Sequence, residues 1–496
     1  MKLINRNLQD LLPLIGFKLP NKILRGITLD SRKVKIGYLF LAVKGHKTDG
    51  RKYISQAIKK GASVIIAEKE ENKKSEIVQY INNVPIIYIS DLKNYLSLLA
   101  EKFYDYPAKK LQLVGVTGTN GKTTISYIIA QLAQGLGEIS AVMGTIGNGI
   151  LTKIVPKNYT TGSAIDVQSD LKLLVDKKAT FVAMEVSSHA LVQSRVSSIP
   201  FKVALFSNLS HEHLDYHGNM KNYEKAKWLL FSTHQSDKQV INIDDDIGLK
   251  WLKKLPKACA VSIKNRIPKD WRGAWLSVEK IHYHKNGTII CFNSIWGRHI
   301  LKSPLIGVFN VNNIMLAIAT LSMLGYPLYM IIKSLIFLQP IYGRMEVFKS
   351  KKYPIVIVDY AHTPDALKKA LIGVRLHFTG ILWCVFGCGG DRDKSKRALM
   401  GSIAEKYADF VILTDDNPRT EESKVIINDI FLGFNNTQRV KKIVDRLEAI
   451  TSVIMEASIN DVILIAGKGH ESYQIIGKRR IKYSDRLTVS RLLGVI

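Results

Sequence analysis

Cysteine is scarce in this chain, with four residues among 496. These four, Cys259, Cys291, Cys384 and Cys388, are scattered, and none belongs to a CxxC pair. Cys384 and Cys388 have no second pair of ligands, so we expect neither a zinc site nor a disulfide framework. A chain without disulfides fits the reducing cytosol, and we therefore expect a cytoplasmic location.

Long apolar runs are also lacking. The N-terminus, MKLINRNLQDLLPLIGF, has no sustained apolar stretch before a small-residue cleavage site. The most apolar region, residues 321–342, is interrupted by Pro327, Lys333 and Pro340. This pattern predicts a core helix with its flanks and no membrane insertion.

Acidic residues are few relative to basic ones, and the net charge is +29. Such an excess could mark a nucleic-acid-binding protein. The basic residues are spread along the chain without a run of five or more, and no recognition module is evident, so we expect no nucleic-acid partner. Two explanations of the charge stay open: a compositional bias of an Ile- and Asn-rich chain, or attraction of anionic small substrates.

The length predicts about three domains, and the alternation of strand-like and helix-like segments predicts that they are α/β. We expect these domains at residues 1–108, 109–338 and 339–496. The apolar runs that predict strands are 27–29, 38–43, 63–67, 85–89, 111–114, 181–186, 203–208, 355–359, 381–386, 410–414 and 462–466. The last four runs predict a second doubly wound sheet.

A glycine-rich loop, GVTGTNGKTT at residues 115–124, is the most informative stretch of the chain. It lies between the apolar run 111–114 and a helical segment that opens at Ile125. Strand, glycine loop, Lys-Thr and helix form a phosphate cradle: backbone N–H groups approach the phosphates, Lys122 reaches the outer ones, and a hydroxyl such as Thr123 can hold Mg²⁺. Val116 stands where the strict P-loop pattern has glycine, and Gly115 and Gly118 bracket it.

Two further apolar runs end in polar residues, at Glu185 and at Asn208. Ligands of open parallel sheets gather at the carboxyl ends of the strands. We therefore expect Glu185 and Asn208 to lie near the phosphate loop.

Taken together, the motifs resemble those of the Mur ligase superfamily, the ATP-dependent amide-forming enzymes of bacterial cell-wall synthesis. The resemblance runs in order through nearly the whole chain. Its motifs are TLDSRKV (28–34), VKGHKTDGRKYISQAI (43–58), GTNGKTT (118–124), YTTGSAIDVQ (159–168), MEVSSHALVQSR (184–195), NLSHEHLDYHG (208–218), YEKAKWLLF (223–231), GVFNVNN (307–313), YGRMEV (342–347), VDYAHTPDAL (358–367), FGCGGDRDKSKR (386–397), DDNPR (415–419) and AGKGHE (466–471).

The resemblance implies a uridine-binding α/β domain, a central P-loop ATPase domain and a Rossmann-like C-terminal domain. Within the family the chain is most similar to the branch that adds meso-2,6-diaminopimelate to UDP-N-acetylmuramoyl-L-alanyl-D-glutamate through an acyl phosphate. The distinguishing motif is Asp416-Asn417-Pro418-Arg419. Diaminopimelate has one more carboxylate than lysine, and an Arg fork binds a carboxylate in a bidentate manner.

Site residues follow from the resemblance position by position. The implied ATP contacts are Gly118, Thr119, Asn120, Gly121, Lys122, Thr123, Thr124, Asn313, Arg344 and Asp359. The implied contacts to the UDP-muramoyl-dipeptide are Leu29, Ser31, His46, Lys47, Thr48, Tyr159, Thr160, Thr161, Ser187, Gln193 and Arg195. The implied contacts to diaminopimelate are Arg392, Asp416, Asn417, Pro418, Arg419, Gly467 and Glu471.

The implied cofactor is Mg²⁺, held by Thr123, Glu185, His213 and Lys227. In the family the lysine at position 227 is carbamylated by CO₂, which gives an N6-carboxylysine. Lys122, Lys227 and His213 are the implied catalytic residues. Taken alone, Lys227 in EKAKW would be interpreted as part of a solvated helix face, with Lys225 as its natural control.

The nearest alternatives are a lysine-adding synthetase, a folylpolyglutamate synthase and a basic nucleic-acid-binding ATPase. We expect a monomer. Because the motifs are split between the second and third segments, we also expect a domain closure during the reaction.

Overall fold

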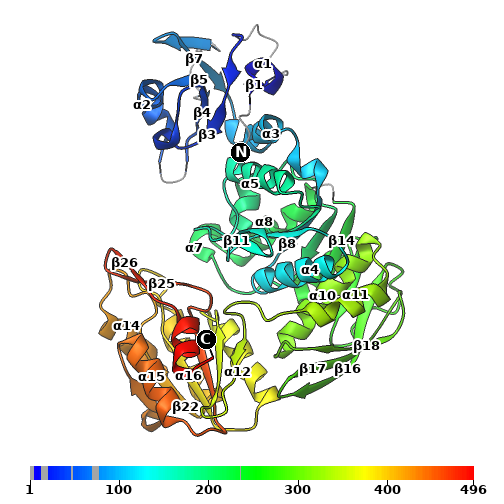
Figure 1. The fold of residues 1–496 in the computed structure, drawn as a ribbon, viewed down its shortest axis with the longest axis vertical. Coiled ribbons are helices and arrows are strands. Elements are labelled where there is room, and N and C mark those ends of the chain that lie inside the picture. The colour runs from blue at the N-terminus through cyan, green and yellow to red at the C-terminus, as the bar shows by residue number, and fades with distance from the viewer. Residues whose placement is uncertain (1–4, 13–19, 46–47, 70–77, 235, 496) are drawn as a thin grey trace. The chain divides into compact units, whose positions relative to one another are not determined.

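The computed structural model describes residues 5–12, 20–45, 48–69, 78–234 and 236–495. The chain forms two compact units (Figure 1). The first contains Met1–Ile241, Lys253–Ala258 and Met323–Gly325, and the second contains Asn242–Leu252, Cys259–Ser322 and Tyr326–Ile496. The domain boundaries at 108/109 and 338/339 stay a prediction.

The N-terminal sheet of the first unit has the strand order β3-β4-β5-β7-β6. The first four of these strands are parallel, and β6 is an antiparallel edge strand that the sequence did not reveal. The expected strands are confirmed to within one or two residues. The elements here are β1 (Arg6–Asn7), α1 (Leu8–Leu11), β2 (Ile23–Leu24), β3 (Gly26–Thr28), β4 (Tyr38–Ala42), α2 (Ile54–Lys59), β5 (Ala62–Glu68), β6 (Val78–Ile81), β7 (Val84–Ile89) and α3 (Leu92–Phe103).

The central sheet of this unit follows the order β11-β10-β9-β12-β8-β13-β14. The strands from β9 to β14 in this order are parallel and their carboxyl ends share one edge, whereas β10 and β11 add an antiparallel edge. Strands β12 and β13 are buried throughout, as their unbroken apolar runs predict for a parallel sheet covered on both faces. The strands are β8 (Gln112–Thr117), β9 (Ser140–Met143), β10 (Asn148–Ile150), β11 (Lys153–Val155), β12 (Phe181–Glu185), β13 (Val203–Phe206) and β14 (Lys238–Asn242).

Helices α3 and α5 pack against each other and join the two sheets of the first unit. The half-buried Ser198 links them: its hydroxyl oxygen is 2.8 Å from that of Ser97 on α3 and accepts from Gln168 of α5 at 3.1 Å. The helices of this part are α4 (Lys122–Gly135), α5 (Ala164–Asp176), α6 (Ser188–Val192), α7 (Leu214–His217) and α8 (Met220–Ser232).

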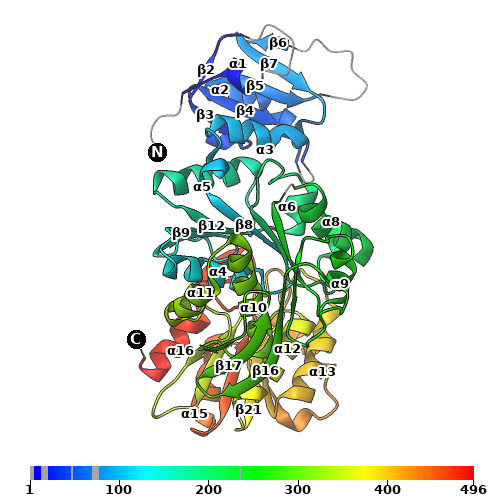
Figure 2. The same ribbon diagram turned by 90° about the vertical axis from the view of Figure 1, so that its right-hand side faces the viewer.

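The second unit contains an antiparallel region that the sequence analysis did not identify. Strands β16 and β17 form a long hairpin (Figure 2). Strand β18 pairs antiparallel to β17, and β15 pairs parallel to β16. Exposure alternates along β17, which indicates that one face of this region is covered and the other is open. The elements are α9 (Asp246–Leu252), β15 (Cys259–Ser262), β16 (Trp275–His284), β17 (Gly287–Ser294), β18 (His299–Ser303), α10 (Val308–Leu324) and α11 (Leu328–Ser334).

The second sheet of this unit has the order β19-β20-β24-β21-β22-β23, parallel except for β19. It confirms the second doubly wound sheet. The elements are β19 (Glu346–Phe348), β20 (Ile355–Asp359), α12 (Pro364–His377), β21 (Leu382–Phe386), α13 (Lys396–Tyr407), β22 (Phe410–Leu413), α14 (Ser423–Phe431), β23 (Val440–Lys442), α15 (Arg446–Glu456), β24 (Val462–Ala466), β25 (Tyr473–Ile476), β26 (Arg479–Lys482) and α16 (Asp485–Leu493).

The sequence predicted a core helix with its flanks over residues 321–342, but this region does not form a single helix. It contains the end of α10, the whole of α11 and a 3₁₀ turn at Leu335–Phe337, because Pro327 begins a new helix. Across the described parts of the chain, we find no helix with the length and apolarity needed to traverse a bilayer. All four cysteines are free.

A fully buried ion pair ties the helices α15 and α16 to the C-terminal sheet. Arg446 donates to both carboxylate oxygens of Asp485 at 2.8 Å. It also donates to the carbonyls of Asp415 (3.1 Å) and Ala466 (2.9 Å), just beyond β22 and at the end of β24. The pair therefore fixes two strand ends from which the loops 415–419 and 466–471 depart.

Removing one partner of this pair would leave a buried charge uncompensated. We expect Asp485→Asn to lower the free energy of unfolding of this unit by about 3–5 kcal/mol. Urea denaturation of the full chain measures the change. The exposed pair Lys441–Glu456 supplies the control, since Glu456→Gln should cost about 1 kcal/mol or less. Equal losses in the two variants would contradict the structural role of Asp485.

Candidate active site

The phosphate loop connects β8 to α4, and its glycines are structurally required. Gly118 has φ +148° and Gly121 has φ +87°. A Cβ at Gly118 would lie 1.9 Å from the hydroxyl of Ser207, so no side chain fits there. Gly115, which the sequence counted with the loop, lies inside β8, and α4 begins at Lys122, three residues before the position we expected.

The neighbouring strand β13 holds this loop through the residues at its carboxyl end. The Asn208 carbonyl accepts from Thr119 N (2.8 Å), and the Asn208 side chain accepts from Asn120 N (2.9 Å). Ser207 donates to the Asn120 carbonyl at 2.7 Å. The expectation that Asn208 lies near the loop is confirmed.

Lys122 folds back over the loop that precedes it. Its ammonium donates to the carbonyls of Gly118 (2.9 Å) and Thr119 (2.7 Å). Thr123 and Thr124 follow in the first turn of α4 and are both buried. A helix N-terminus after a glycine turn presents backbone N–H groups to an anion, and Lys122 lies beside it.

Lys227 corrects the expectation of a solvated helix face. It lies on α8 and its residue is only 1% exposed, whereas Lys225 on the same helix is exposed. Its amine donates to the Gly118 carbonyl at 2.7 Å and lies 4.5 Å from the centre of the Tyr223 ring. Burial lowers the pKa of Lys227 well below its usual value, and the nearby Lys122 lowers it further.

Glu185 ends β12 beside Val116 of β8 and is buried. Its carboxylate accepts hydrogen bonds from Thr145, from the backbone N at 2.8 Å and from the hydroxyl at 3.0 Å. Sequence analysis overlooked Thr145, because this residue lies outside the recognised motifs. Glu185 thus lies at the strand edge that bears the phosphate loop, as expected.

His213 has a left-handed backbone with φ +56°, and its side chain is 45% exposed. Its ring contacts those of His189 and Tyr223, with centroids 5.1 Å and 6.2 Å away. Within the described ranges, no three His, Cys, Asp or Glu side chains surround one metal position. The oxygens of Thr123 and Glu185 suit Mg²⁺, but an ammonium at Lys227 does not.

Five residues implied for the muramoyl-peptide form one connected network in the first unit. Arg195 donates to the Thr161 carbonyl (2.7 Å) and to the Gln193 side chain (2.6 Å and 3.0 Å). Thr161 accepts from Ser187 N and donates to the Glu185 carbonyl. The hydroxyl of Thr160 is 3.0 Å from that of Thr145. The structure therefore joins this set to Glu185.

The residues implied for uridine are less connected. Ser31 is buried and donates to Gln56 at 2.7 Å. Leu29 is half-buried and Thr48 is exposed. His46 and Lys47 lie outside the described residues. Tyr159, which belongs to the set implied for the muramoyl-peptide, is half-buried, with the Lys157 ammonium 5.9 Å from its ring centre.

The implied ATP contacts of the second unit lie on different elements. Asn313 on α10 donates to Asn310 at 3.0 Å. Asp359 ends β20 and accepts from the backbone N of Met345 (2.8 Å) and of Ala361 (2.9 Å). Arg344 lies over the Tyr360 ring, 4.4 Å from its centre. Asp359 and Arg344 are thereby close together through Met345 and Tyr360.

The residues implied for the amino acid meet at the strand ends of the C-terminal sheet. Asn417 donates to Asp416 and to Glu471, each at 3.0 Å. Lys468, which the sequence analysis overlooked within AGKGHE, is fully buried, donates to Glu471 at 2.9 Å and lies 3.7 Å from Asp416. Two carboxylates and one ammonium leave this cluster with one negative charge.

The arginines of this site lie on two loops, one after β21 and one after β22. Hydrogen bonds join these loops to each other. Gly390 N donates to the Asn417 carbonyl at 2.9 Å, and Arg419 donates to the Gly390 carbonyl at 2.6 Å. Arg397, which is fully buried, binds both oxygens of Glu421 at 2.9 Å and lowers the pKa of Glu421 to about 2. Arg392 itself is exposed.

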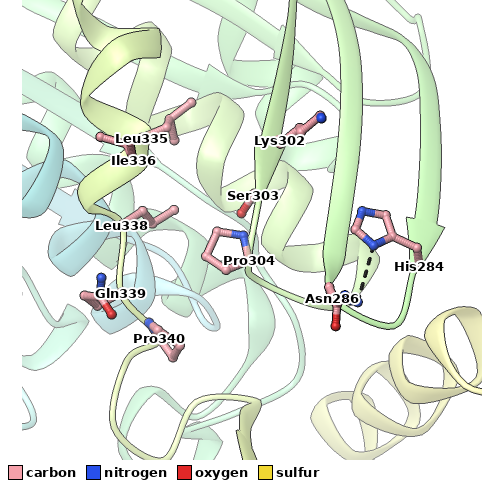
Figure 3. A pocket seen from close by; sticks show the side chains of 10 residues that line it. All are labelled: His284, Asn286, Lys302, Ser303, Pro304, Leu335, Ile336, Leu338, Gln339 and Pro340. Atoms are coloured by element: carbon pink, nitrogen blue, oxygen red, sulfur yellow. Dashed lines mark hydrogen bonds between the residues drawn. The ribbon is translucent and has the colours of Figure 1, made fainter.

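The second unit also contains a pocket of about 470 Å³. It is lined by His284, Asn286, Lys302, Ser303, Pro304, Leu335, Ile336, Leu338, Gln339 and Pro340 (Figure 3). None of the implied substrate, nucleotide or metal contacts belongs to it.

The Gly118 geometry generates a direct test. Gly118→Ala should abolish ATP binding, because the added Cβ would meet Ser207 and force the loop to move. Calorimetric titration with ATP measures binding, and a thermal melt monitors folding. Gly137→Ala is the control: it has φ +98° and nothing within 4 Å, so it should cost about 1–2 kcal/mol of stability and leave ATP binding intact. Normal ATP affinity in Gly118→Ala would refute the expectation.

Family models match the chain in three successive ranges. The Mur ligase family catalytic domain matches residues 24–104, the Mur ligase middle domain 116–321, and the Mur ligase glutamate ligase domain 343–469. The three matches lie within the three segments expected from the sequence.

Several solved structures are similar to this chain over most of its length. A UDP-N-acetylmuramoyl-L-alanyl-D-glutamate–2,6-diaminopimelate ligase shares 34% identity over 99% of both chains, with a TM-score of 0.71. MurF ligase from Thermotoga maritima in complex with ADP shares 19% identity over 90% of this chain and 94% of its own, with a TM-score of 0.63. Mycobacterium tuberculosis folylpolyglutamate synthase shares 16% over 75% and 92%, with a TM-score of 0.62.

The two more distant structures share the fold alone, whereas the first combines substantial identity with nearly complete coverage of both chains. Members of the matched family are ATP-dependent ligases that form amide bonds. With all three parts of the chain matched in order, the chain belongs to the Mur ligase family.

Proposed function

We propose that this chain forms the amide bond between UDP-N-acetylmuramoyl-L-alanyl-D-glutamate and meso-2,6-diaminopimelate, using ATP. The observation that carries the choice of amino acid is the pair of bonded loops that places Arg419 beside the Asn417–Glu471–Lys468 cluster. An arginine next to a singly negative cluster suits an amino acid end that bears one carboxylate and one ammonium. The 34% identity to a diaminopimelate ligase supports the same choice.

A carboxylate is a poor electrophile, and the proposed reaction therefore has two steps. A carboxylate oxygen of the substrate attacks the γ-phosphorus of ATP, ADP leaves, and an acyl phosphate forms. The neutral amine of diaminopimelate then attacks the acyl carbon, the tetrahedral intermediate collapses, and phosphate and a proton leave. The protein mainly positions the reactants and neutralises charge.

For the phosphates, we assign the loop Gly118–Thr124 together with Lys122. Backbone N–H groups of the first turn of α4 would bind phosphate oxygens, and the Lys122 ammonium would exchange its two carbonyl acceptors for phosphate. In the second unit, Asn313, Arg344 and Asp359 are the proposed nucleotide contacts.

The proposed Mg²⁺ ligands are Thr123, Glu185, His213 and Lys227 in carbamylated form. When bound, the ion supplies positive charge that neutralises the transferring phosphoryl group. Thr123 and Glu185 provide oxygen donors as they stand, but Lys227 fits only after its charge is reversed.

The environment of Lys227 supports that reversal. Because burial favours the neutral amine, its nitrogen lone pair is available to attack CO₂. The C–N bond forms, one proton leaves the nitrogen for solvent, and an anionic carbamate results. The carbamate anion of Lys227 would then lie next to the Lys122 cation, where the Lys227 amine lies now.

The network Thr161–Ser187–Gln193–Arg195 is the proposed contact surface for the muramoyl-peptide. Its hydroxyl, amide and guanidinium groups suit an anionic ligand with many hydroxyls. Thr160 and Tyr159 extend it, and Leu29, Ser31, His46, Lys47 and Thr48 are the proposed uridine contacts.

The amino acid distinguishes this proposal from its closest alternative. With ATP, Mg²⁺ and the UDP-muramoyl-dipeptide, we expect phosphate release with meso-diaminopimelate and little with L-lysine, because lysine lacks the carboxylate that Arg419 would bind. Release with lysine alone would retain the family and refute the amino acid. Release with neither would refute the proposed reaction.

The two lysines of α8 provide a matched pair of variants. Lys227→Ala should lower kcat by roughly 100-fold or more, the loss typical of a group that acts on transition-state charge, and Lys225→Ala should leave kcat unchanged. Phosphate release measures both. Mass spectrometry of native protein in bicarbonate buffer should show an added carbamate that Lys227→Ala lacks. Full activity of Lys227→Ala would contradict the assigned role.

A further inference from the structure

Gly389 lies against the guanidinium of Arg419. A Cβ built at Gly389 would come within 2.8 Å of Arg419 Nη1, and the next nearest atoms, Arg392 Cγ and Arg419 Cζ, are each 3.8 Å away. All three are side-chain atoms of Arg392 and Arg419, the two arginines that the family resemblance implies as diaminopimelate contacts. The guanidinium of Arg419 therefore occupies the space that a side chain at position 389 would fill.

The other glycines around this site behave differently. A Cβ at Gly387 would lie 2.0 Å from the Thr414 carbonyl oxygen, and a Cβ at Gly390 would lie 1.9 Å from that of Pro418. Gly467 has φ +113°, a conformation that disfavours any side chain. These three positions are constrained by backbone, so substitution there would distort the loops themselves. At Gly389 the obstacle is the far end of a flexible side chain.

The backbone of Arg419 is held in place, and only the end of its side chain is free to move. Its φ is +53°, its backbone N donates to the Ile475 carbonyl (3.0 Å), and its carbonyl accepts from Gly477 N (2.6 Å). The hairpin β25–β26 thus fixes the backbone and the direction in which the side chain leaves. What remains to be set is the position of the guanidinium.

The loop of Gly389 and Gly390 sets this position. Both hydrogen bonds of the guanidinium to described residues are donated by Nη1, to the carbonyls of Gly390 (2.6 Å) and Asn417 (3.5 Å). Among the described residues, Nε and Nη2 have no acceptor. These two groups form one edge of the fork, and this is the edge that can bind a carboxylate with two parallel hydrogen bonds.

We infer that Gly389 determines specificity for the second carboxylate of the amino acid substrate, by allowing Arg419 to lie flat against the loop with its Nε–Nη2 edge outward. The inference rests on the proposed function. Any side chain at position 389 would push the guanidinium off the Gly390 carbonyl and tilt that edge. The backbone of Gly389 does not require glycine, because its φ lies outside the left-handed range.

The test is Gly389→Ala in the full-length enzyme. We expect the KM for meso-diaminopimelate to rise roughly tenfold, and the preference for diaminopimelate over L-lysine to fall by a similar factor, as expected for one weakened charge-assisted contact. The kcat, the KM values for ATP and the UDP-muramoyl-dipeptide, and the melting temperature should stay close to wild type. An unchanged KM for diaminopimelate would overturn the inference.

A double-mutant cycle tests whether Gly389 acts through Arg419. In an Arg419→Ala background, adding Gly389→Ala should not raise the KM for diaminopimelate further, because the displaced group is gone. A further rise of the same size would overturn the inference. Gly390→Ala serves as the comparison for a distorted loop and should lower the melting temperature.

The activity of the wild-type enzyme distinguishes an error in the proposed function from an error in the role of Gly389. If wild type does not use diaminopimelate, the proposed function is wrong. If wild type uses diaminopimelate and Gly389→Ala keeps its KM, the proposed function stands and only the role of Gly389 is wrong.

Discussion

Two lysine side chains, Lys122 and Lys227, donate to one backbone oxygen, the carbonyl of Gly118. Lys227 is buried and Lys122 is half-buried, and two ammonium groups that share one acceptor repel each other. The site resolves the conflict by depressing the pKa of Lys227, which burial and the Lys122 charge both do. A lysine amine with a lowered pKa is more readily available as a nucleophile, and an anionic phosphate or carbamate would relieve the repulsion from Lys122. The proposed chemistry of the central sheet follows from this one constraint.

The amino-acid site of the second unit is built differently, since its buried Lys468 and Arg397 each face carboxylates. Lys468 lies between Glu471 and Asp416, and Arg397 holds Glu421 at the end of the loop that carries Arg419. Beneath them, the Arg446–Asp485 pair anchors the two strand ends. Such buried networks rigidify a site when every member has a partner. A rigid backbone leaves the tip of Arg419 as the adjustable part, which is why one missing Cβ at Gly389 matters.

Much of the fold could be predicted from the sequence, because buried parallel strands are continuous apolar runs. Strands such as 355–359 and 462–466 were identified to the residue. The hairpin β16–β17 was missed because its strands are half exposed, and in β16 polar residues separate most of the apolar ones. The site was predicted wherever residues lie in compact motifs at strand ends. Thr145, Arg397, Arg446 and Lys468 escaped notice because their importance lies in partners 20 to 40 residues or more away, or in burial that a motif does not reveal.

The sequence by itself determined the order of α/β segments, the phosphate loop and the family resemblance, since each depends on residues adjacent in the chain. The tertiary structure alone decided which polar groups are buried and what they contact. Lys225 and Lys227 illustrate the difference: they are two positions apart on one helix, and the helical period directs one to solvent and the other to the Gly118 carbonyl. The pKa of a lysine depends on how deeply it is buried and on which charges lie near it, and no local sequence pattern encodes these surroundings.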